Sequence, residues 1–245
     1  MALNLIMLGP PGAGKGTQAE RFARSRGIPK ISTGDILREA VHAGTDVGKR
    51  AKAIMDRGEL ISDDVMIGIV RERLDRDDAR SGFVLDGFPR TVAQAEALDS
   101  IMFGRDPLIV VDIVVPEAEL VRRLASRLIC EVCGANAAMA DNAAVAAADK
   151  AVLPGASGTA AETVAAVLAQ TDPMRCRRCG GRLVQRADDD AHVVLERLKV
   201  YDHNTKPLVD FYRVRPTFRT IDGAQRPEKV AEELAAAVEA IGGRR

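Results

Sequence analysis

The chain has 245 residues, and its 35 basic and 35 acidic side chains give a formal net charge of zero at pH 7. This balance gives no sign of a nucleic-acid or membrane partner, and no apolar stretch approaches the roughly 20 residues of a membrane-spanning helix. The length predicts one medium-sized domain with insertions, or two domains. The N-terminus enters an apolar run without a charged leader, so we expect a cytoplasmic location.

The most informative segment is Gly9–Thr17, which reads Gly-Pro-Pro-Gly-Ala-Gly-Lys-Gly-Thr and lies between the apolar run Leu3–Leu8 and a helical pattern over Thr17–Ser25. A glycine-rich turn between a strand and a helix lets backbone N–H groups surround an anion, and Lys15 reaches the β- and γ-phosphates. The segment therefore predicts a nucleoside triphosphate site. The alternative is a glycine- and proline-rich turn with an incidental lysine.

The position that follows this lysine departs from the general pattern. A hydroxyl usually ligates Mg²⁺ there, but this chain has Gly16, with Thr17 one place later. We therefore expect the metal to be held by nucleotide oxygens and by waters that carboxylates orient, an arrangement that Mg²⁺ tolerates.

Short apolar runs alternate with helical patterns along the chain. Further strands are expected at Ile28–Ser32, Phe83–Leu85, Leu108–Val115 and Phe218–Ile221, and helices at Val65–Leu74, Thr91–Met102, Glu117–Leu128 and Val193–Tyr201. This alternation predicts an α/β fold with a parallel sheet covered by helices on both faces. Phosphate sites in such sheets lie at the carboxyl ends of strands. The segments that follow the expected strands are therefore candidates for function.

The segment Asp86–Arg90 follows the third expected strand. An aspartate at that place can orient metal-bound water, Gly87 permits close backbone approach, and Arg90 supplies a planar guanidinium suited to phosphate. The alternative for Asp86 is a turn aspartate that is hydrogen-bonded to its own backbone.

Four cysteines form two Cys-x-x-Cys pairs, each followed by glycine: Cys130, Cys133, Cys176 and Cys179. Such pairs predict a closed tetrahedral zinc site with a structural role. Residues 134–175 separate the pairs, a longer spacing than the usual 15–20 or so residues. Because the cost of loop closure rises only logarithmically with length, zinc remains the prediction, and free buried thiols or two redox pairs are the alternatives.

The segment Ala135–Gln170 between the cysteine pairs is rich in alanine. Ala137–Val152 has the composition of a helix, Pro154–Gly158 breaks the pattern, and Thr159–Glu162 is a capping box for a second helix. We therefore expect a helical hairpin. A low-complexity loop is the alternative, because so few large side chains offset little of the ordering entropy.

Four motifs, in order along the chain, resemble those of adenylate kinases. They are Gly9–Thr17, Ser32–Arg38, Asp86–Arg90 with Gln94, and Arg186–Asp189 with Arg197. The resemblance covers the chain apart from roughly residues 137–171. It implies a P-loop core with a parallel five-stranded sheet flanked by helices in residues 1–31, 62–125 and 190–245. It also implies an AMP-binding flap in residues 32–61 and a lid in residues 126–189, of the zinc-bearing type that some adenylate kinases carry.

The resemblance implies reversible phosphoryl transfer, in which ATP plus AMP gives two ADP, and a role for each matching residue. ATP would be bound by Gly12, Ala13, Gly14, Lys15, Gly16, Thr17, Arg123, Arg127, Asn136 and Gln225. AMP would be bound by Thr33, Arg38, Glu59, Leu60, Ile61, Gly87, Phe88, Pro89, Arg90, Gln94, Arg186 and Arg197. The catalytic cations would be Lys15, Arg90, Arg127, Arg186 and Arg197, and Asp35 and Asp86 would orient waters on Mg²⁺. Asn136-Ala137 stands where the family commonly has a Thr-Tyr-like pair.

The chemistry agrees with such a set of cations. A loose phosphoryl-transfer transition state spreads charge over its oxygens, so catalysis is positioning plus electrostatic stabilisation. We expect ATP, AMP and ADP as partners, Mg²⁺ with ATP, a structural zinc ion, no nucleic acid, no membrane and a monomer. One alternative is a kinase for another nucleoside monophosphate. Another is a zinc-knuckle protein that binds nucleic acid or acts as a scaffold, against which the charge balance argues.

Overall fold

The computed structural model describes residues 2–134, 136–138 and 174–242. The chain divides into a larger unit, Met1–Val121 with His192–Arg245, and a smaller unit, Arg122–Ala191. Most of the expected helical hairpin between the cysteine pairs lies outside the described residues. Every helix in the described ranges is too short or too polar to span a lipid bilayer.

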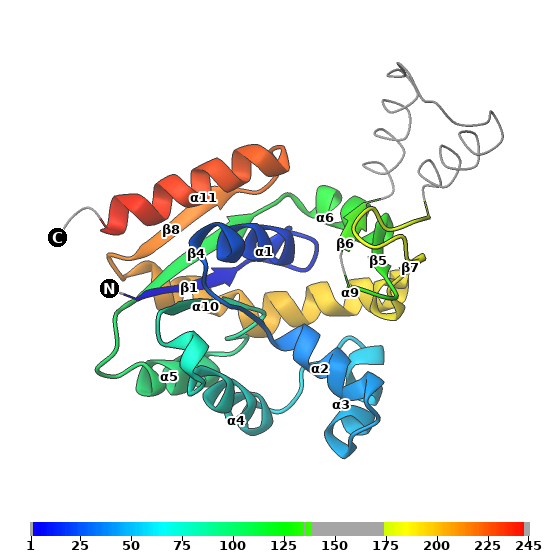
Figure 1. Cartoon of the computed structure of the whole chain (residues 1–245), viewed down its shortest axis with the longest axis horizontal. Coiled ribbons are helices and arrows are strands. Elements are labelled where there is room, and N and C mark those ends of the chain that lie inside the picture. Colours follow the sequence, from blue (N-terminus) through cyan, green and yellow to red (C-terminus); the bar gives the residue numbers. More distant parts are fainter. Residues whose placement is uncertain (1, 135, 139–173, 243–245) are drawn as a thin grey trace, which may run out of the picture. The chain divides into compact units, whose positions relative to one another are not determined.

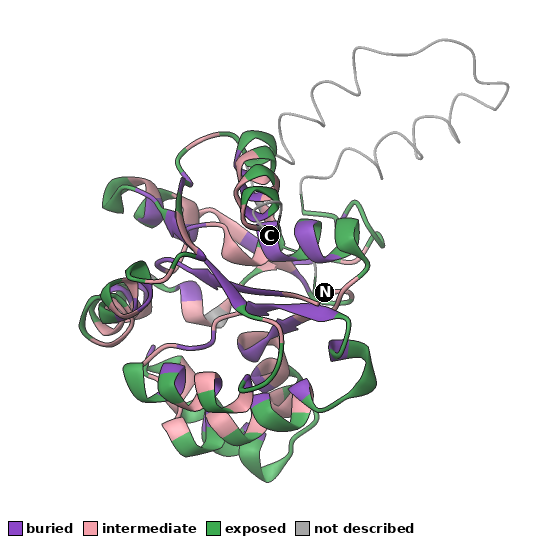
Figure 2. Ribbon diagram, turned by 90° about the vertical axis from the view of Figure 1, so that its left-hand side faces the viewer, coloured by how far each residue is buried: buried purple, intermediate pink, exposed green. Residues whose placement is uncertain are grey.

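The larger unit is built on a parallel five-stranded sheet in the order β2-β3-β1-β4-β8 (Figure 1). The strands are β1 (Leu3–Leu8), β2 (Lys30–Ser32), β3 (Gly82–Asp86), β4 (Leu108–Val114) and β8 (Phe218–Asp222). Nearly all residues of β1, β3 and β4 are buried, as expected for a parallel sheet that is covered on both faces. Figure 2 shows these buried strands running between layers of helices. The predicted α/β fold with five parallel strands is confirmed.

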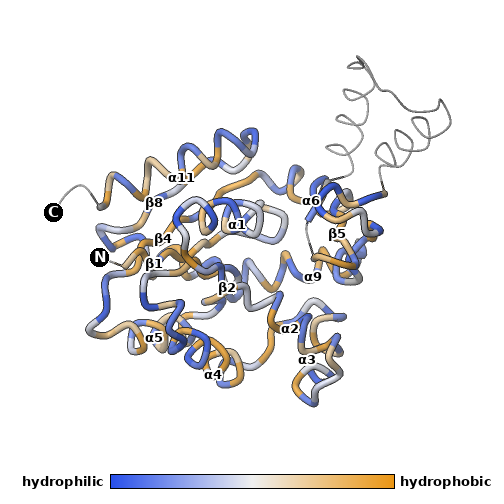
Figure 3. The backbone as a smooth tube through the Cα atoms, viewed as in Figure 1, coloured by the Kyte–Doolittle hydropathy of each residue, from blue (hydrophilic) through white to orange (hydrophobic). Residues whose placement is uncertain are grey.

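The helices of the larger unit pack on the sheet through alternating side chains of its strands. On one face, Ile6 and Leu8 join a core with residues of α4 (Asp63–Leu74), α5 (Val92–Ile101) and α10 (Pro207–Arg213). α1 (Lys15–Arg26) contacts α11 (Pro227–Gly242), and both helices also contact strands. Hydrophobic residues concentrate on the central strands β1 and β4 (Figure 3). Successive side chains of β1 point to opposite faces of the sheet, so one strand packs against helices on both faces.

Two short helices, α2 and α3, follow β2, and the helix α9 lies later in the chain. α2 (Thr33–His42) is capped by the preceding Ser32, whose Oγ accepts a hydrogen bond from the Asp35 backbone amide at 3.2 Å. α3 (Asp46–Asp56) is capped in the same way by Thr45. α9 (Ala191–Val200) continues into a wide π turn over Tyr201–Thr205, and a single 3₁₀ turn spans Asp77–Ala79. Side-chain caps of this kind satisfy amides that a helix start leaves without a partner.

The start of β2 differs by two residues from the sequence expectation, whereas the bounds of β3, β4 and β8 differ by one residue. β2 begins at Lys30 instead of Ile28, because the Ile28 amide donates to the carbonyl of Ala23 at 3.1 Å and so closes the end of α1. Gly27, in the left-handed conformation with φ 64°, makes this helix end possible. Ile28 therefore belongs to the cap of α1 and not to a strand.

The smaller unit contains a three-stranded antiparallel sheet in the order β6-β5-β7. Its strands are β5 (Arg127–Cys130), β6 (Asn136–Ala138) and β7 (Leu183–Gln185), and a 3₁₀ turn spans Ala187–Asp189. Leu128, Cys130, Cys176 and Leu183 form its buried core. Among the residues of this unit that the structure describes, the core is small, so their hydrophobic burial alone contributes little stability.

The smaller unit also overturns two helix predictions. α6 (Glu117–Ala125) ends before the expected Leu128, because residues 127–130 pair with both β6 and β7. The expected helix from Ala137 is likewise wrong at its start, since Ala137 pairs with Leu128 in β6. Cross-strand pairing therefore overrides local helical propensity at both places.

Candidate active site and cysteine cluster

The carboxyl ends of three neighbouring strands meet at one edge of the larger sheet. Asp86 of β3 is in register with Met7 of β1 and with Ser32 of β2. The segments that follow these strands carry the phosphate-loop motif, the Thr33–Arg38 motif and the Asp86–Arg90 motif. The sheet order therefore brings three motifs that are distant in sequence to a common edge, as expected for a parallel α/β fold.

The glycine-rich loop after β1 depends on residues that have no Cβ. A Cβ on Gly9 would lie 2.6 Å from the carbonyl oxygen of Ile113. Gly12 and Gly14 have φ values of 85° and 91°, which other residues rarely adopt. Gly14 is the N-cap residue that precedes α1, and no described side chain caps the first turn of this helix. Amides at an uncapped helix start favour binding of an anion.

Lys15 lies at the first position of α1 and its ammonium group folds back over the loop. Its Nζ donates to the carbonyl oxygens of Gly9 at 2.6 Å and Pro10 at 2.8 Å. Gly16 follows in the first turn and Thr17 is exposed, whereas Ala13 is buried. The cation is thus held at the loop itself, where the sequence motif places it.

A buried carboxylate lies on β4 beside the phosphate loop. Asp112, 6% exposed, is in register with Leu8, the last residue of β1. Burial raises the pKa of its carboxyl, and the positive charges of Lys15 and Arg213 partly offset that effect. Sequence reasoning missed this residue, although one acidic position inside the apolar run Leu108–Val115 is a visible signal.

Two of the predicted AMP-binding motifs are joined through one carbonyl group. The carbonyl oxygen of Gly87 accepts hydrogen bonds from Thr33 Oγ1 at 2.9 Å and from Arg90 Nε at 2.8 Å. Gly87 has φ 81°, and a Cβ there would lie 3.0 Å from both Thr33 Oγ1 and Arg90 Nη2. Phe88 and Pro89, joined by a cis peptide bond, are both buried. Glycine at position 87 therefore allows this close approach.

Gln94, only 1% exposed, has both ends of its side-chain amide bonded. Its Oε1 accepts from the Arg90 amide at 2.8 Å, and its Nε2 donates to Asp63 Oδ1 at 2.7 Å. The other carboxylate oxygen of Asp63 accepts from Thr91 Oγ1 at 3.0 Å. Asp63 was not predicted, and its place at the start of α4, 31 residues before Gln94, gives no local signal of the contact.

Asp35 and Arg38 form an ion pair on the first turns of α2. Lys30 Nζ lies 3.3 Å from the second carboxylate oxygen of Asp35. Burial alone would raise the pKa of Asp35, but the Arg38 guanidinium and the other partners hold it below the usual value. The residue expected to orient metal-bound water is thus ionised and anchored by cations.

The end of α3 packs against the helix that carries Arg197. Gly58, buried and with φ 76°, would place a Cβ 3.0 Å from Arg197 Cγ and 3.1 Å from the carbonyl oxygen of Val193. The next three residues are the predicted AMP-binding backbone segment Glu59–Ile61, in which Glu59 forms a two-point ion pair with Arg57 at 2.7 and 2.8 Å. Val194 and Leu198 are buried, so Arg197 lies beside the core-facing side of α9.

Gln225 lies between β8 and α11, in the stretch that the sequence predicts for ATP binding. Its side-chain amide donates to both carboxylate oxygens of Glu233 at 3.0 Å and to the carbonyl oxygen of Asp222 at 3.2 Å. These bonds connect the end of the strand to the following helix and so define the path of this connection.

In the smaller unit, two predicted arginines pair with neighbouring carboxylates. Arg127 Nε donates to Asp189 Oδ2 at 2.6 Å and its Nη2 bonds the other oxygen, while Asp189 is 2% exposed. Arg186 donates to both oxygens of Asp188 at 2.9 and 2.8 Å. The aspartates belong to the quoted Arg186–Asp189 motif, but their orienting contacts were not predicted. Arg123 is half-buried on α6, and Asn136 is exposed on β6.

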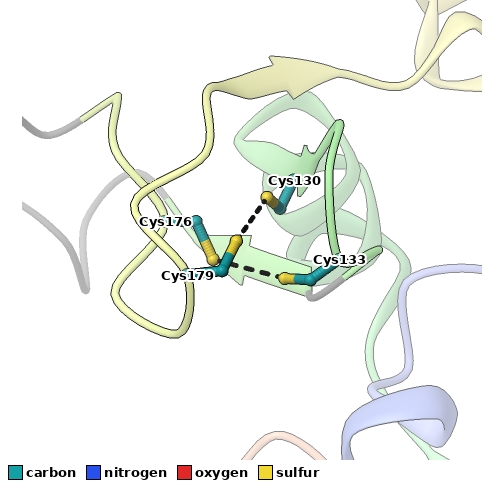
Figure 4. Close-up of side chains that lie close together, drawn as sticks. All are labelled: Cys130, Cys133, Cys176 and Cys179. Atoms are coloured by element: carbon teal, nitrogen blue, oxygen red, sulfur yellow. Dashed lines mark hydrogen bonds between the residues drawn. The ribbon is translucent and has the colours of Figure 1, made fainter.

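The four cysteines converge in the smaller unit, and their sulfur atoms point toward one another (Figure 4). All four Sγ atoms lie within 4.8 Å of one another, with Cys130–Cys179 at 3.5 Å and Cys133–Cys176 at 3.6 Å. All are free thiols. Four sulfurs at about 2.3 Å from a central zinc ion would be separated by a little under 4 Å, so this donor set fits tetrahedral zinc.

Similar backbone turns present the two halves of this cluster. The amide of Gly134 donates to the Cys130 carbonyl at 3.0 Å, and the amide of Gly180 donates to the Cys176 carbonyl at 2.7 Å. Both glycines have positive φ, 67° and 73°. Because each turn is completed within its own Cys-x-x-Cys-Gly segment, the cluster forms regardless of the long separation in sequence.

The larger unit has the architecture of a P-loop nucleotide-binding protein, in which a helix starts on a glycine-rich loop at the carboxyl edge of a parallel sheet. β3, which is followed by the Asp86–Arg90 motif, lies next to β1 and its glycine-rich loop in the sheet. This arrangement is that of the nucleoside monophosphate kinases, which are phosphotransferases.

Comparison with known proteins identifies the family. The model of the adenylate kinase family matches residues 7–217. An adenylate kinase from Archaeoglobus fulgidus is 46% identical over 241 residues, 98% of this chain and 99% of that protein. Adenylate kinases from Geobacillus sp. strain WCH70 and Rhizobium etli are 45% and 41% identical over 95% and 96% of this chain. The chain belongs to the adenylate kinase family, and the resemblance inferred from its four motifs is confirmed.

Proposed function

We propose that this chain catalyses reversible phosphoryl transfer between ATP and AMP, giving two ADP. The observation that carries this proposal is the meeting of the phosphate-loop, Thr33–Arg38 and Asp86–Arg90 motifs at one sheet edge, through the registers of β1, β2 and β3. The similarity to an adenylate kinase, 46% identity over 98% of this chain, supports the same reaction.

ATP would be bound through the loop after β1 and by residues of the smaller unit. The amides of Gly12–Thr17 and the ammonium of Lys15 suit the β- and γ-phosphates. Arg123, Arg127 and Asn136 would contact ATP, with the Gln225 carbonyl facing the adenine. The pairing of Arg127 with buried Asp189 fixes the plane of its guanidinium, so less side-chain entropy is lost when it meets a phosphate.

AMP would be bound by the motifs that follow β2 and β3. Arg38, Arg90 and Arg197 would face its phosphate, and Arg186 would reach the transferred group. Thr33, the Glu59–Ile61 and Gly87–Pro89 backbones, and Gln94 would surround the nucleoside. The shared contact of Thr33 and Arg90 with the Gly87 carbonyl supports this assignment, because it connects two of the proposed elements directly.

The chemistry proposed for these residues is electrostatic and geometric. An AMP phosphate is already anionic and nucleophilic near neutral pH, so the protein has to align two phosphate chains and stabilise the charge on the transferred group. Guanidinium groups suit this role because they stay protonated. Mg²⁺, when bound with ATP, neutralises charge between the β- and γ-phosphates. Asp35 and Asp86 would orient its waters, since both lie near the ends of β2 and β3.

We also propose how the chain is organised into a flap and a lid. Residues 32–61 would form the AMP-binding flap and residues 126–189 the lid. A zinc ion held by Cys130, Cys133, Cys176 and Cys179 would be structural, because four protein ligands leave no open coordination position. The monomeric state and the cytoplasmic location remain predictions from the sequence.

The proposed reaction is tested by measuring ADP formed from ATP and AMP in the presence of Mg²⁺. The same assay with GMP, CMP and UMP separates adenylate kinase from a kinase for another nucleoside monophosphate. Turnover should be fastest with AMP. Faster turnover with any of the other three would overturn the assignment of the acceptor.

Lys15→Met should lower kcat by about 100-fold or more, because it removes a charge directed at the transferring phosphate. The control is Lys229→Met, which removes an exposed ammonium from α11 and should leave kcat within about twofold of the unmodified protein. Thermal unfolding should show that both variants fold. Near-normal turnover of the Lys15 variant would count against the proposed ATP site.

A further inference from the structure

The orientation of the Gln94 side-chain amide is fixed chemically by its two partners. The backbone N–H of Arg90 can only donate, so the group facing it at 2.8 Å is Oε1. The ionised carboxylate of Asp63 can only accept, so the group facing it at 2.7 Å is Nε2. Rotating the amide by 180° would place donor against donor and acceptor against acceptor. These two contacts therefore determine which end of Gln94 accepts.

Asp63 is itself held in place. The second carboxylate oxygen of Asp63 accepts a hydrogen bond from Thr91 Oγ1 at 3.0 Å. Thr91 Oγ1 also caps α5, because it accepts from the backbone N–H of Gln94 at 3.2 Å. Asp63 is the first residue of α4, where the helix dipole favours negative charge. Since Gln94 is almost fully buried, solvent would poorly replace a lost partner. The amide orientation is thus set by the Arg90 backbone N–H and by the Asp63 carboxylate, which Thr91 holds in place.

An amide held in this way has one lone pair left on Oε1 and one hydrogen left on Nε2. Adenine offers a complementary edge, because its N6 amino group donates and its N1 accepts. Guanine offers the opposite pattern, since its O6 accepts and its N1–H donates. A fixed Gln94 therefore matches adenine and opposes guanine, whereas an amide free to rotate could match either base.

We propose that Asp63 is a specificity-determining residue that acts through Gln94 to select an adenine-bearing acceptor nucleotide over a guanine-bearing one. The inference rests on the proposed function, because it takes AMP as the acceptor and Gln94 as a contact to its base. Asp63 is a positioning residue and touches no substrate in this scheme. The Arg90 amide remains as a second constraint when Asp63 is lost, so discrimination should fall without being abolished.

The test is the Asp63→Ala variant, assayed for kcat/KM with AMP and with GMP. The ratio of the AMP value to the GMP value should fall by about tenfold, the usual effect of losing one hydrogen bond to a charged group. KM for ATP should stay within about twofold of the unmodified protein. The matched control is Asp64→Ala, which removes an exposed carboxylate from the adjacent position of α4 and should leave the ratio unchanged.

Two further variants separate positioning from a general structural contribution. Asp63→Asn keeps a carbonyl oxygen that can accept from Gln94 Nε2. The AMP/GMP ratio of this variant should therefore stay within about threefold of that of the unmodified protein, in contrast to the ratio of Asp63→Ala. In a Gln94→Leu background, Asp63→Ala should leave the ratio unchanged, because the amide that it orients is gone. Full loss of discrimination in Asp63→Asn, or an undiminished effect in the Gln94→Leu background, would overturn the proposal.

The outcomes also separate this inference from the proposed function. If the unmodified protein does not prefer AMP, the proposed function fails first. If it does prefer AMP and Asp63→Ala keeps the same AMP/GMP ratio, only the role of Asp63 is wrong. A variant in which the constants for AMP, GMP and ATP all worsen equally also contradicts the proposal, since that pattern indicates a loosened fold. Should Asp63→Ala not fold, the Asp63→Asn variant and its comparison with Gln94→Leu provide the measurement.

Discussion

At the scale of single residues, Asp112 is a carboxyl that folding places in an unfavourable environment. It lies in the middle of a buried strand, and Lys15 and Arg213 only partly offset the cost of burial. A carboxyl whose pKa is raised on folding binds more protons in the folded state than in the unfolded state. The unfolding free energy therefore falls as pH rises from about 4, the unfolded pKa, through the higher folded pKa.

Asp112→Asn should remove this pH-dependent penalty. The variant should gain stability relative to the unmodified protein as pH rises from 4 to 7, by about 1 kcal/mol, the common size of a single-residue effect. Urea denaturation at one-unit pH steps measures the difference. Asp210→Asn, at an exposed position of α10, is the control and should give a constant difference. A pH-independent difference for Asp112→Asn would contradict the prediction.

The candidate site residues could be named from the sequence because their motifs are local, and their roles remain proposals. Lys15 follows its own loop, and Arg90 and Gln94 lie within one short segment with their shared contacts. Asp63 and Asp112 were missed because what matters about them is a partner from another element. Asp63 bonds Gln94 across two helices, and Asp112, which lies in register with Leu8 of the adjacent strand, is influenced by the charge of Lys15. A pattern in one dimension does not reveal such neighbours.

At the scale of secondary-structure elements, the expected strands and the main helices of the sheet unit are present, and β1 has the expected bounds. The errors lie where another element decides the conformation. Ile28 closes the end of α1, and Arg127–Cys130 leaves the helical pattern to pair with two strands. The alternation of half-buried and buried residues along β5 has a period of two, but four residues are too few to separate it from the end of a helix.

The contact between Gly58 and α9 predicts a coupling between the predicted AMP-binding backbone and Arg197. Gly58→Ala should lower kcat/KM for AMP by roughly five- to twentyfold, because the new methyl group displaces the aliphatic part of Arg197 by a few tenths of an ångström. Steady-state kinetics with AMP measures the effect. A crystal structure of the variant should show the shift of the Arg197 side chain.

Gly44 provides the matched control for the backbone strain at Gly58. It has a similar positive φ of 67°, and a Cβ there would have open space. Both alanine variants should lose about 1–2 kcal/mol of stability from the left-handed conformation alone. Gly44→Ala should keep normal kinetics. Equal kinetic losses in the two variants would show that strain, and not the contact with Arg197, explains the effect.

At the scale of the whole molecule, the two units differ in what holds them together. The sheet unit buries side chains on both faces of its strands, whereas the part of the smaller unit that the structure describes has four buried core residues, two of which are cysteines. So small a described core leaves a large share of the stability of this part to its proposed metal. The order of motifs predicted the overall architecture, but the composition of the sequence could not indicate how unequal the two cores are.

Removal of zinc should therefore destabilise the smaller unit selectively. Cys176→Ser, or treatment with a strong chelator, should abolish bound zinc and lower the melting temperature of that unit by 10 °C or so, while the transition of the sheet unit stays nearly unchanged. Elemental analysis measures the zinc, and calorimetry resolves the transitions. Re-addition of zinc after chelation should restore the first transition. Purified protein without zinc, or a single unaffected transition, would contradict the zinc assignment.

The cysteine cluster also bears on how this chain can change in length. Its four sulfurs gather within 4.8 Å although the two pairs are far apart in sequence. The two Cys-x-x-Cys-Gly turns therefore form one compact cluster, although residues 135–175 separate them in the sequence. Each doubling of a loop costs only about 0.6 kcal/mol in closure entropy. The segment between the two cysteine pairs is accordingly a place where an inserted sequence would lower the stability of the rest of the protein only slightly.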